Sequence, residues 1–163
     1  RKHKIEINLI LCGGKKNYAQ EILQYIKDKK ISHLTNYLGI LKQAEIIKLY
    51  NSSAAVIIPS YYESSSLVLL ESGSVKKDII ASNIKPLKEM GKIFHVNYFD
   101  IYSVESLEKI LIDFWKGKLI NKNKIRKNYI SSKKYSWFFI AQKYIILVDR
   151  ITSSLIGKYR DKK

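Results

Sequence analysis

The chain has 163 residues and is short of several residue types, and each shortage excludes a class of protein. Cys12 is its one cysteine, so neither an internal disulfide nor a cysteine metal site can form, and a reducing, cytosolic setting is expected. Its apolar runs fall far short of the roughly 20 residues that a transmembrane helix needs. The basic opening, Arg1 to Lys4, is followed by no apolar stretch with a cleavage site, so no signal peptide is expected.

Acidic residues are also scarce, because 14 Asp and Glu stand against 30 Lys and Arg, a net charge of +16. Such a field favours anionic partners such as nucleic acids, acidic lipid headgroups or phosphorylated substrates. A Lys-, Ile-, Asn- and Tyr-rich composition typical of AT-rich genomes is the plainer explanation of the charge. Basic residues are not interleaved with aromatics along one strand, so no nucleic-acid partner is expected. The three histidines are scattered, and no metal-ligand cluster is found.

With 46% hydrophobic residues, the chain can bury a core, and its apolar runs alternate with helical patterns. Strands are expected at 5–12, 33–38, 54–58, 78–82 and 92–96, and helices at 18–29, 43–50, 66–75, 103–116, 121–133 and 136–156. The alternation predicts an α/β fold with a Rossmann-like parallel sheet flanked by helices. Because the strands are apolar on both faces, helices should cover both faces of the sheet. No repeat or linker is visible, so residues 1–163 are expected to form a single domain.

Two glutamates, Glu63 and Glu71, mark the candidate site. Glu63 follows the apolar run at 54–58 and Pro59, and Glu71 lies about two helical turns further on. Ligands of open α/β sheets bind beyond the carboxyl ends of the strands, which is where this loop should lie. Two carboxylates there can bind the hydroxyl groups of a sugar and a ribose. Two unrelated surface carboxylates are the ordinary alternative for a pair of glutamates, and their place at a strand–loop–helix junction argues against it.

Glycines and serines near strand ends add phosphate-binding candidates. Gly13 and Gly14 follow the first strand, where glycine lets the backbone approach a phosphate, although a plain turn explains them equally well when taken alone. Ser64, Ser65 and Ser66 open the helix that bears Glu71. Free N–H groups and the dipole at a helix start suit a diphosphate, and ordinary capping is the alternative.

The ordered series of motifs resembles the C-terminal domain of a GT-B glycosyltransferase, most closely family GT4 (glycosyl transferases group 1). The segments that resemble it are 9–14 (LILCGG), 37–41 (YLGIL), 54–60 (AAVIIPS), 63–71 (ESSSLVLLE), 79–83 (IIASN), Glu89 and 136–137 (SW). The fourth segment matches the E-x7-E signature of the family. The resemblance covers about residues 5 to 150 and implies the C-terminal half of a GT-B fold, with residues 135–156 as the closing helix.

The resemblance implies a role for each matched residue. Glu63 would be the catalytic residue that faces the donor sugar. The implied donor-binding residues are Gly13, Gly14, Leu41, Ser64, Ser65, Ser66, Leu67 and Glu71. Within this set Leu41 would meet the base, the serine-loop amides the diphosphate, and Glu71 the ribose. The family retains anomeric configuration and needs no metal held by an Asp-x-Asp motif, so no cofactor is expected, and the chain has no such motif.

The function that the resemblance implies is transfer of a hexose from a nucleotide-diphosphate sugar to a glycan or lipid-linked acceptor, in bacterial surface polysaccharide synthesis. The expected place is the cytoplasm, with peripheral contact at the inner face of the membrane through the basic surface. The acceptor domain, and a basic element that neutralises the donor diphosphate, are expected before residue 1. The fragment alone is therefore expected to have little activity.

The sequence departs from the family pattern at several positions, which keeps other functions open. Serines replace the glycines of the usual E-G-F-G loop, and Lys76 and Asp78 replace a usual glycine and proline. A non-catalytic binding module derived from the same fold is the first alternative, although both glutamates are retained. A basic nucleic-acid binder is the second. It predicts steeply salt-dependent binding, and no motif supports it.

Overall fold

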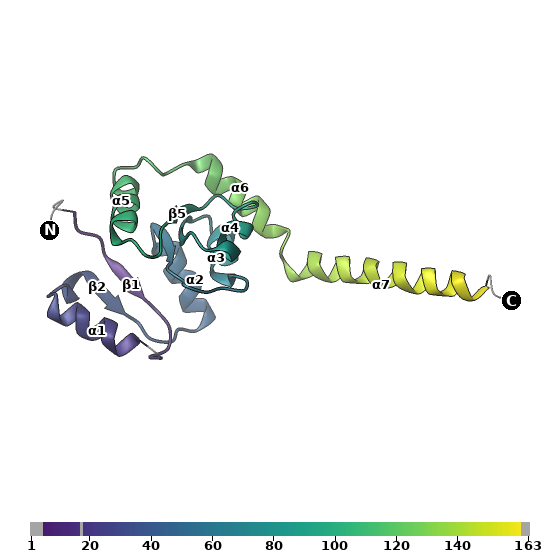
Figure 1. Ribbon diagram of the computed structural model, residues 1–163, viewed down its shortest axis with the longest axis horizontal. Helices are drawn as coiled ribbons and strands as arrows, with labels where there is room; N and C mark the ends of the chain where they lie inside the picture. Colours follow the sequence, from purple (N-terminus) through teal and green to yellow (C-terminus); the bar gives the residue numbers. More distant parts are fainter. Residues whose placement is uncertain (1–4, 17, 161–163) are drawn as a thin grey trace. The chain divides into compact units, whose positions relative to one another are not determined.

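The computed structural model describes residues 5–16 and 18–160, and in the last helix it describes side chains up to residue 153. The chain forms two compact units, residues 1–49 and 50–163. Figure 1 labels most elements of the two units, and helix α2 (Gln43–Ser52) contains the boundary in the sequence. Each unit is described by itself below.

The first unit contains a two-stranded parallel sheet. In chain order its elements are β1 (Leu9–Leu11), α1 (Ala19–Asp28), a 3-10 helix (Ser32–Leu34) and β2 (Thr35–Tyr37). β1 pairs with β2 with Ile10 opposite Asn36, and α1 buries Ile26. Both strands are shorter than predicted. The predicted burial of β1 is wrong, since Leu9 and Ile10 are about two-fifths exposed (40% and 38%). In the described chain β1 has β2 as its one neighbouring strand, so it lacks the second neighbour that would help to cover it.

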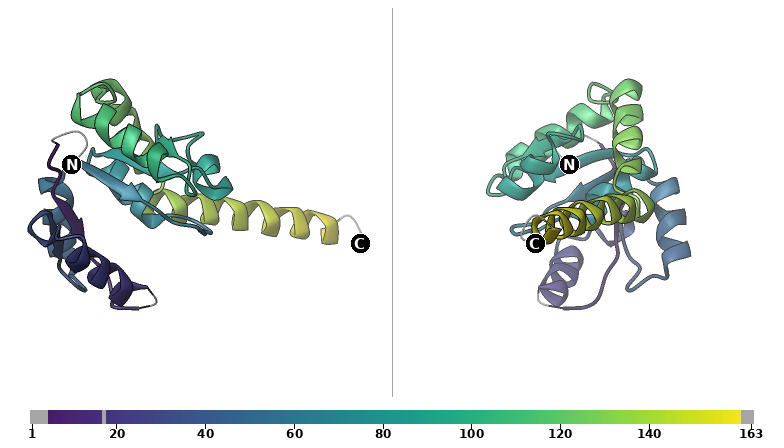
Figure 2. Two further views of the ribbon diagram at one scale, coloured as in Figure 1. Left: turned by 60° about the vertical axis from the view of Figure 1, so that its left-hand side comes forward. Right: turned by 90° about the vertical axis from the view of Figure 1, so that its right-hand side faces the viewer.

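The second unit contains a three-stranded parallel sheet in the order β3-β4-β5. In chain order its elements are β3 (Ala55–Ile58), α3 (Leu67–Ser74), β4 (Asp78–Ser82), α4 (Lys85–Met90), β5 (Asn97–Phe99), α5 (Val104–Trp115), α6 (Lys122–Lys133) and α7 (Trp137–Arg160). The strands can be followed with α5 and α6 in Figure 2. Ile58 lies opposite Ala81, and Ser82 lies opposite Phe99. All three carboxyl ends therefore meet at one edge of the sheet, and parallel sheets flanked by helices confirm the predicted class.

The core of the second unit surrounds its central strand. In β4, Ile79, Ile80 and Ala81 are almost completely buried, as a strand covered on both faces requires. The buried cluster contains Ile58 from β3, Leu69 from α3, Ile79 and Ala81 from β4, Leu87 from α4, and Phe94 from the segment before β5. α3 packs against β3, β4 and α6, and α5 packs against β5. The loop between β3 and α3 is thus fixed to the core at both of its ends.

The prediction of a strand at residues 92–96 is wrong. That segment is a turn, and β5 begins at Asn97, after a helix (α4) that was not predicted. Pro86 lies in the first turn of α4, where proline is tolerated. The apolar residues that indicated a strand serve another purpose, since Phe94 inserts into the core from the turn. Tertiary packing therefore explains its hydrophobicity without any strand pairing.

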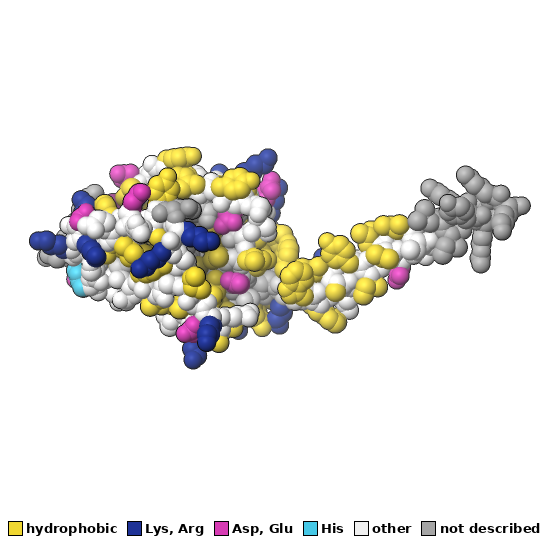
Figure 3. All heavy atoms as spheres, turned by 90° about the horizontal axis from the view of Figure 1, so that it is seen from below, with side chains coloured by type: hydrophobic (Ala, Val, Ile, Leu, Met, Phe, Trp, Pro, Cys, Tyr) yellow, Lys and Arg dark blue, Asp and Glu magenta, His cyan; other side chains and the backbone are white. Residues whose placement is uncertain are grey.

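Helix α7 is the closing helix predicted from the sequence, and many of its apolar side chains are exposed. They include Trp137, Phe138, Phe139, Tyr144, Ile145, Ile146, Leu147, Val148 and Ile151. Figure 3 shows hydrophobic side chains along this helix. In the part of the chain that the structure describes, no helix combines the length and the apolar character needed to cross a membrane.

Candidate functional site

Glu63 lies in the loop between β3 and α3, beyond the carboxyl end of the sheet, and two serines hold this loop. Ser82, at the end of β4, is fully buried and donates its hydroxyl hydrogen bond to the Ser60 carbonyl oxygen at 2.6 Å. The Ser60 hydroxyl donates in turn to Glu63 Oε1 at 2.9 Å. A chain of two hydrogen bonds thus links the central strand to the Glu63 carboxylate, which is half-buried.

The start of α3 presents backbone donors next to this carboxylate in the sequence. Ser66 is buried and caps the helix, because its Oγ accepts from the Leu69 N–H at 3.3 Å. The Ser66 N–H itself faces Met90 Sδ at 3.4 Å. Among the described residues, no acceptor binds the N–H groups of Ser64, Ser65 or Leu67. These donors lie at a helix N-terminus, where the dipole favours an anion.

Glu71 lies in α3 and is exposed. Its Oε2 accepts a hydrogen bond of 2.8 Å from the Tyr50 hydroxyl, which comes from α2. The same part of α2 is tied to the turn after α3, since Lys77 Nζ donates to the Asn51 carbonyl oxygen at 2.9 Å. The Glu71 carboxylate is therefore oriented by a neighbouring helix while it stays open to solvent.

Gly13 and the residues before Leu41 lie together in the first unit, at the carboxyl ends of β1 and β2. The Gly13 N–H donates to the Gly39 carbonyl oxygen at 2.8 Å, and both glycines have positive φ (+132° and +69°). The Tyr37 hydroxyl donates to the Gly13 carbonyl oxygen. A Cβ on Gly14 would lie 3.8 Å from the Ile40 side chain, and Leu41 follows, partly buried. Only glycine adopts these two positive φ values without strain, so the local backbone conformation is enough to explain Gly13 and Gly39.

Two exposed tyrosines belong to the edge of the sheet where Glu63 lies. Tyr61 follows β3 and Tyr102 follows β5, and their ring centroids are 6.0 Å apart. Their open faces can stack on a sugar or a base. Among the described residues, no three His, Cys, Asp or Glu side chains are grouped to hold a metal ion.

The structure thus places the predicted residues in two groups. Glu63, Ser64, Ser65, Ser66, Leu67 and Glu71 lie in the second unit, on the β3–α3 loop and on α3 itself. Gly13, Gly14 and Leu41 lie in the first unit. Their roles in binding remain predictions.

Three residues that support the glutamates were missed in the sequence. Ser82 had a signal, since its hydroxyl group directly follows the apolar residues 79–81 and needs a partner there. Ser60 and Tyr50 had none, because their partners are set by tertiary contacts.

Burial perturbs two ionisable groups of the second unit. It raises the pKa of Asp78, at the start of β4, because burial disfavours the charged carboxylate. It also raises the pKa of Tyr98, whose hydroxyl donates to the Leu87 carbonyl oxygen at 2.9 Å. Asp78 begins β4 and Ser82 ends it, so this acid lies at the end of the strand away from the Glu63 loop.

Comparison with known proteins identifies relatives that match most of the chain. The family model described as "Glycosyl transferases group 1" matches residues 1–134. An uncharacterized glycosyltransferase of Methanocaldococcus jannaschii is 25% identical over 163 residues, which cover 96% of this chain and 40% of that protein. O-antigen chain mannosyltransferase B of Escherichia coli is 23% identical over 133 residues, which cover 78% of this chain and 34% of that protein.

Solved structures share the fold. HepE of Anabaena, crystallised in complex with UDP-glucose, superimposes with a TM-score of 0.76 at 17% identity. The match covers 88% of this chain and 41% of HepE. The chain therefore spans about a third to two-fifths of the length of these relatives.

Proposed function

Because the chain belongs to the glycosyl transferases group 1 family, we propose that it is the donor-binding part of a retaining glycosyltransferase that uses a nucleotide-diphosphate sugar. The observation that carries the proposal is the β3–α3 loop. It combines an oriented carboxylate at Glu63, N–H groups at Ser64, Ser65 and Leu67 for which the described residues provide no acceptor, and a second oriented carboxylate at Glu71. HepE has been solved with UDP-glucose, which supports a donor of the same class.

The chemistry of the loop fits this donor. Transfer breaks the bond between the anomeric carbon and the diphosphate oxygen, so negative charge develops on the leaving diphosphate. Fixed N–H groups at the start of α3 stabilise that charge without reorganising, the largest single contribution in many enzymes. Glu63 faces the sugar, and Glu71 accepts hydrogen bonds from the ribose hydroxyls. No step in this scheme calls for a bound cofactor.

The acceptor half belongs to a longer protein in this proposal. The chain spans 40% of the archaeal relative and 34% of the Escherichia coli one. The exposed apolar side chains of α7 are the surface that the remaining part would cover. We expect this chain alone to bind donor and to show little turnover, and robust transfer by it would refute that expectation.

The acceptor we propose is a glycan or a lipid-linked saccharide in bacterial surface polysaccharide synthesis. The similarity to an O-antigen mannosyltransferase supports it. A basic surface, with a net charge of +16, suits peripheral contact with an anionic membrane from the cytoplasmic side.

A non-catalytic binding module of the same fold is the second candidate, and the serines that replace glycines in the Glu63 loop favour it. The two candidates differ in the consequence of changing Glu63. In a full-length enzyme Glu63→Ala abolishes transfer, whereas a module that only binds a partner is indifferent to it.

A paired comparison of nucleotides tests the donor site on this chain. Affinities for UDP, GDP and ADP are measured by calorimetry, each beside its 2′-deoxy form, for the wild type and for Glu71→Ala. A hydrogen bond from a ribose hydroxyl to a carboxylate contributes about 1.5–3 kcal/mol, so removal of either partner should weaken binding at least about tenfold. Removing both should cost little more than removing one.

The exposed Glu21→Ala in α1 provides the charge-matched control and should leave affinity unchanged. If the 2′-hydroxyl and Glu71 contribute independently, the assignment of Glu71 to the ribose is wrong.

A further inference from the structure

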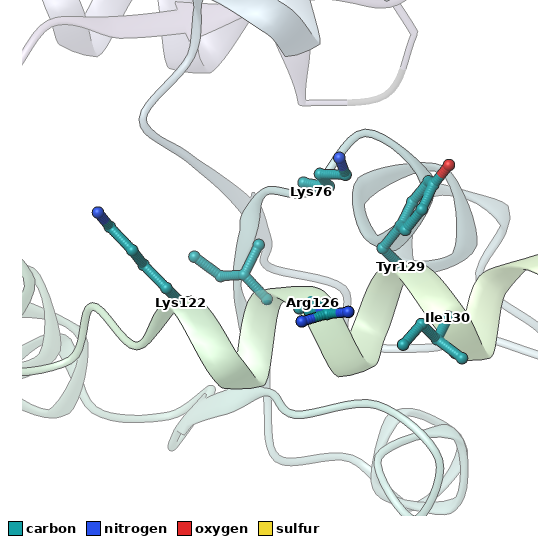
Figure 4. Close-up of a pocket in the computed structure, with 6 residues that line it drawn as sticks. Lys76, Lys122, Arg126, Tyr129 and Ile130 are labelled. Carbon is teal, nitrogen blue, oxygen red and sulfur yellow. The ribbon is translucent and has the colours of Figure 1, made fainter.

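A basic pocket lies on helix α6, near the end of α3 that is opposite to the Glu63 loop. Its volume is about 460 Å³ (Figure 4). The lining residues are Lys76, Lys122, Ile125, Arg126, Tyr129 and Ile130. Ser66 caps the start of α3 and Lys76 follows its end, so the pocket and the proposed donor loop are different places on the second unit.

The pocket gathers positive charge without a compensating acid. α6 has five basic residues and no acidic one. In the described part of the chain, no carboxylate forms an ion pair with Lys76, Lys122 or Arg126. Lys122 and Arg126 are four residues apart and share one face of α6, where like charges repel by about 0.2–0.5 kcal/mol. An anion between them would remove this repulsion.

Lys76 adopts a backbone conformation that favours glycine. Its φ is +59°, and the left-handed region costs a residue with a Cβ about 1–2 kcal/mol. This conformation aims the side chain at α6, where Lys76 Nζ lies 4.6 Å from the centroid of the Tyr129 ring. Lys133 Nζ lies 4.6 Å from the same ring. Lys76 is thus the third cation of the pocket, beside Lys122 and Arg126. Backbone strain at such a residue motivates a functional hypothesis.

Buried hydrogen bonds and close helix packing hold α6, which lines the pocket, against the rest of the second unit. Asn128 of α6 is buried, and its amide binds both backbone groups of His95: Oδ1 accepts from the N–H at 2.7 Å and Nδ2 donates to the carbonyl oxygen at 2.9 Å. α3 approaches α6 closely, since a Cβ on Gly73 would lie 3.4 Å from the Asn128 carbonyl oxygen. A preformed site loses little conformational freedom when its ligand binds.

We infer that this pocket binds a phosphate group, independently of the proposed donor site. An Arg guanidinium beside two ammonium groups matches the oxygens of a phosphate. Ile125 and Ile130 form an apolar side, so the phosphate would be attached to an apolar group or exposed at a lipid surface. A phosphorylated small molecule and a phospholipid headgroup share this chemistry.

The test compares two double variants of the whole chain. Lys122→Ala/Arg126→Ala removes two positive charges from the pocket. Lys124→Ala/Lys127→Ala removes the same charge from the opposite side of α6. All four side chains are exposed, so both variants should fold. Inorganic phosphate is titrated by amide NMR, and vesicles of phosphatidylglycerol in phosphatidylcholine are titrated by co-sedimentation at constant ionic strength.

We expect the pocket variant to weaken binding by about tenfold or more and the control variant by about twofold or less, because loss of charge-assisted hydrogen bonds exceeds a screened surface effect. Phosphate should shift the amides of Lys76, Arg126 and Tyr129. A pocket-dependent loss in the phosphate titration indicates a soluble ligand, and one confined to vesicles indicates a lipid headgroup.

Equal weakening by both variants would show diffuse surface charge and overturn the proposal. So would the absence of pocket-dependent binding in both arms. Neither outcome bears on the donor site, which is read from nucleotide-dependent shifts at residues 64–67.

Discussion

Ser82→Ala tests whether the hydrogen-bond chain from β4 positions Glu63. Ser82 is completely buried at the end of the strand, and its hydroxyl donates to the Ser60 carbonyl oxygen at 2.6 Å. Ser60 in turn donates to the Glu63 carboxylate. Alanine removes the donor while keeping the backbone and nearly all of the packing, so the loop would lose one defined tether.

The magnitude follows from the environment of the two groups. A carbonyl that loses its partner in a buried place costs about 1–3 kcal/mol, and Ser60 is only partly buried, so water can compensate. We therefore expect Ser82→Ala to lower the free energy of unfolding by about 1 kcal/mol. A loosened loop can reduce donor affinity by no more than the same free energy, which corresponds to about fivefold in Kd.

Ser72→Ala is the matched control, because Ser72 is equally buried and donates to the Val68 carbonyl oxygen at 2.6 Å, within α3. Urea unfolding and calorimetric titration with nucleotide sugar would be measured for both variants. We expect the weaker affinity for Ser82→Ala alone. An unchanged affinity, or an equal loss in Ser72→Ala, would refute the positioning role of the serine chain.

Two further predictions concern stability. Asn128→Ala should lower the free energy of unfolding by about 2–4 kcal/mol, because it leaves both backbone groups of His95 without their buried partner; urea unfolding measures it. Asp78→Asn should raise the thermal midpoint at pH 7. Burial raises the folded-state pKa of Asp78, so the stability linked to its protonation is fully present below the unfolded value of 3.8 and is lost as pH rises through the folded pKa.

Both predictions have controls on exposed helix positions. Asn123→Ala, on α6, changes the same residue type where the side chain is exposed, and its stability should change by about 0.5 kcal/mol or less. Asp149→Asn, on α7, removes the same charge as Asp78→Asn. If Asp149→Asn raises the midpoint equally, or if Asp78→Asn acts equally at pH 3 and pH 7, burial of Asp78 is not the cause.

The sequence predicted best those elements whose signals are local. β4 has the predicted bounds because a continuous apolar run between polar residues describes a strand covered on both faces. α5 and α6 begin one residue after their predicted starts, and the side chains of Ser103 and Asn121 accept the capping hydrogen bonds. Glu63 and Glu71 fall on the loop and helix where the E-x7-E spacing placed them.

Features that depend on contacts between distant residues could not be predicted. Phe94 looked like part of a strand, and only the packed core shows that a turn buries it. The hydrogen bond from Tyr50 to Glu71 joins residues 21 positions apart. Lys76 counted in the sequence as a departure from a family glycine, and its approach to Tyr129 became visible only when α3 and α6 were packed together.

The most direct test of the central claim is an amide NMR titration of this chain with UDP, GDP, ADP and their sugar conjugates. The donor-site account predicts saturable shifts at residues 64–71 with one base preferred, together with shifts at Gly13 and Leu41. An absence of shifts at residues 64–71 with every nucleotide at millimolar concentration, or shifts confined to other surfaces, would contradict a donor site on the β3–α3 loop.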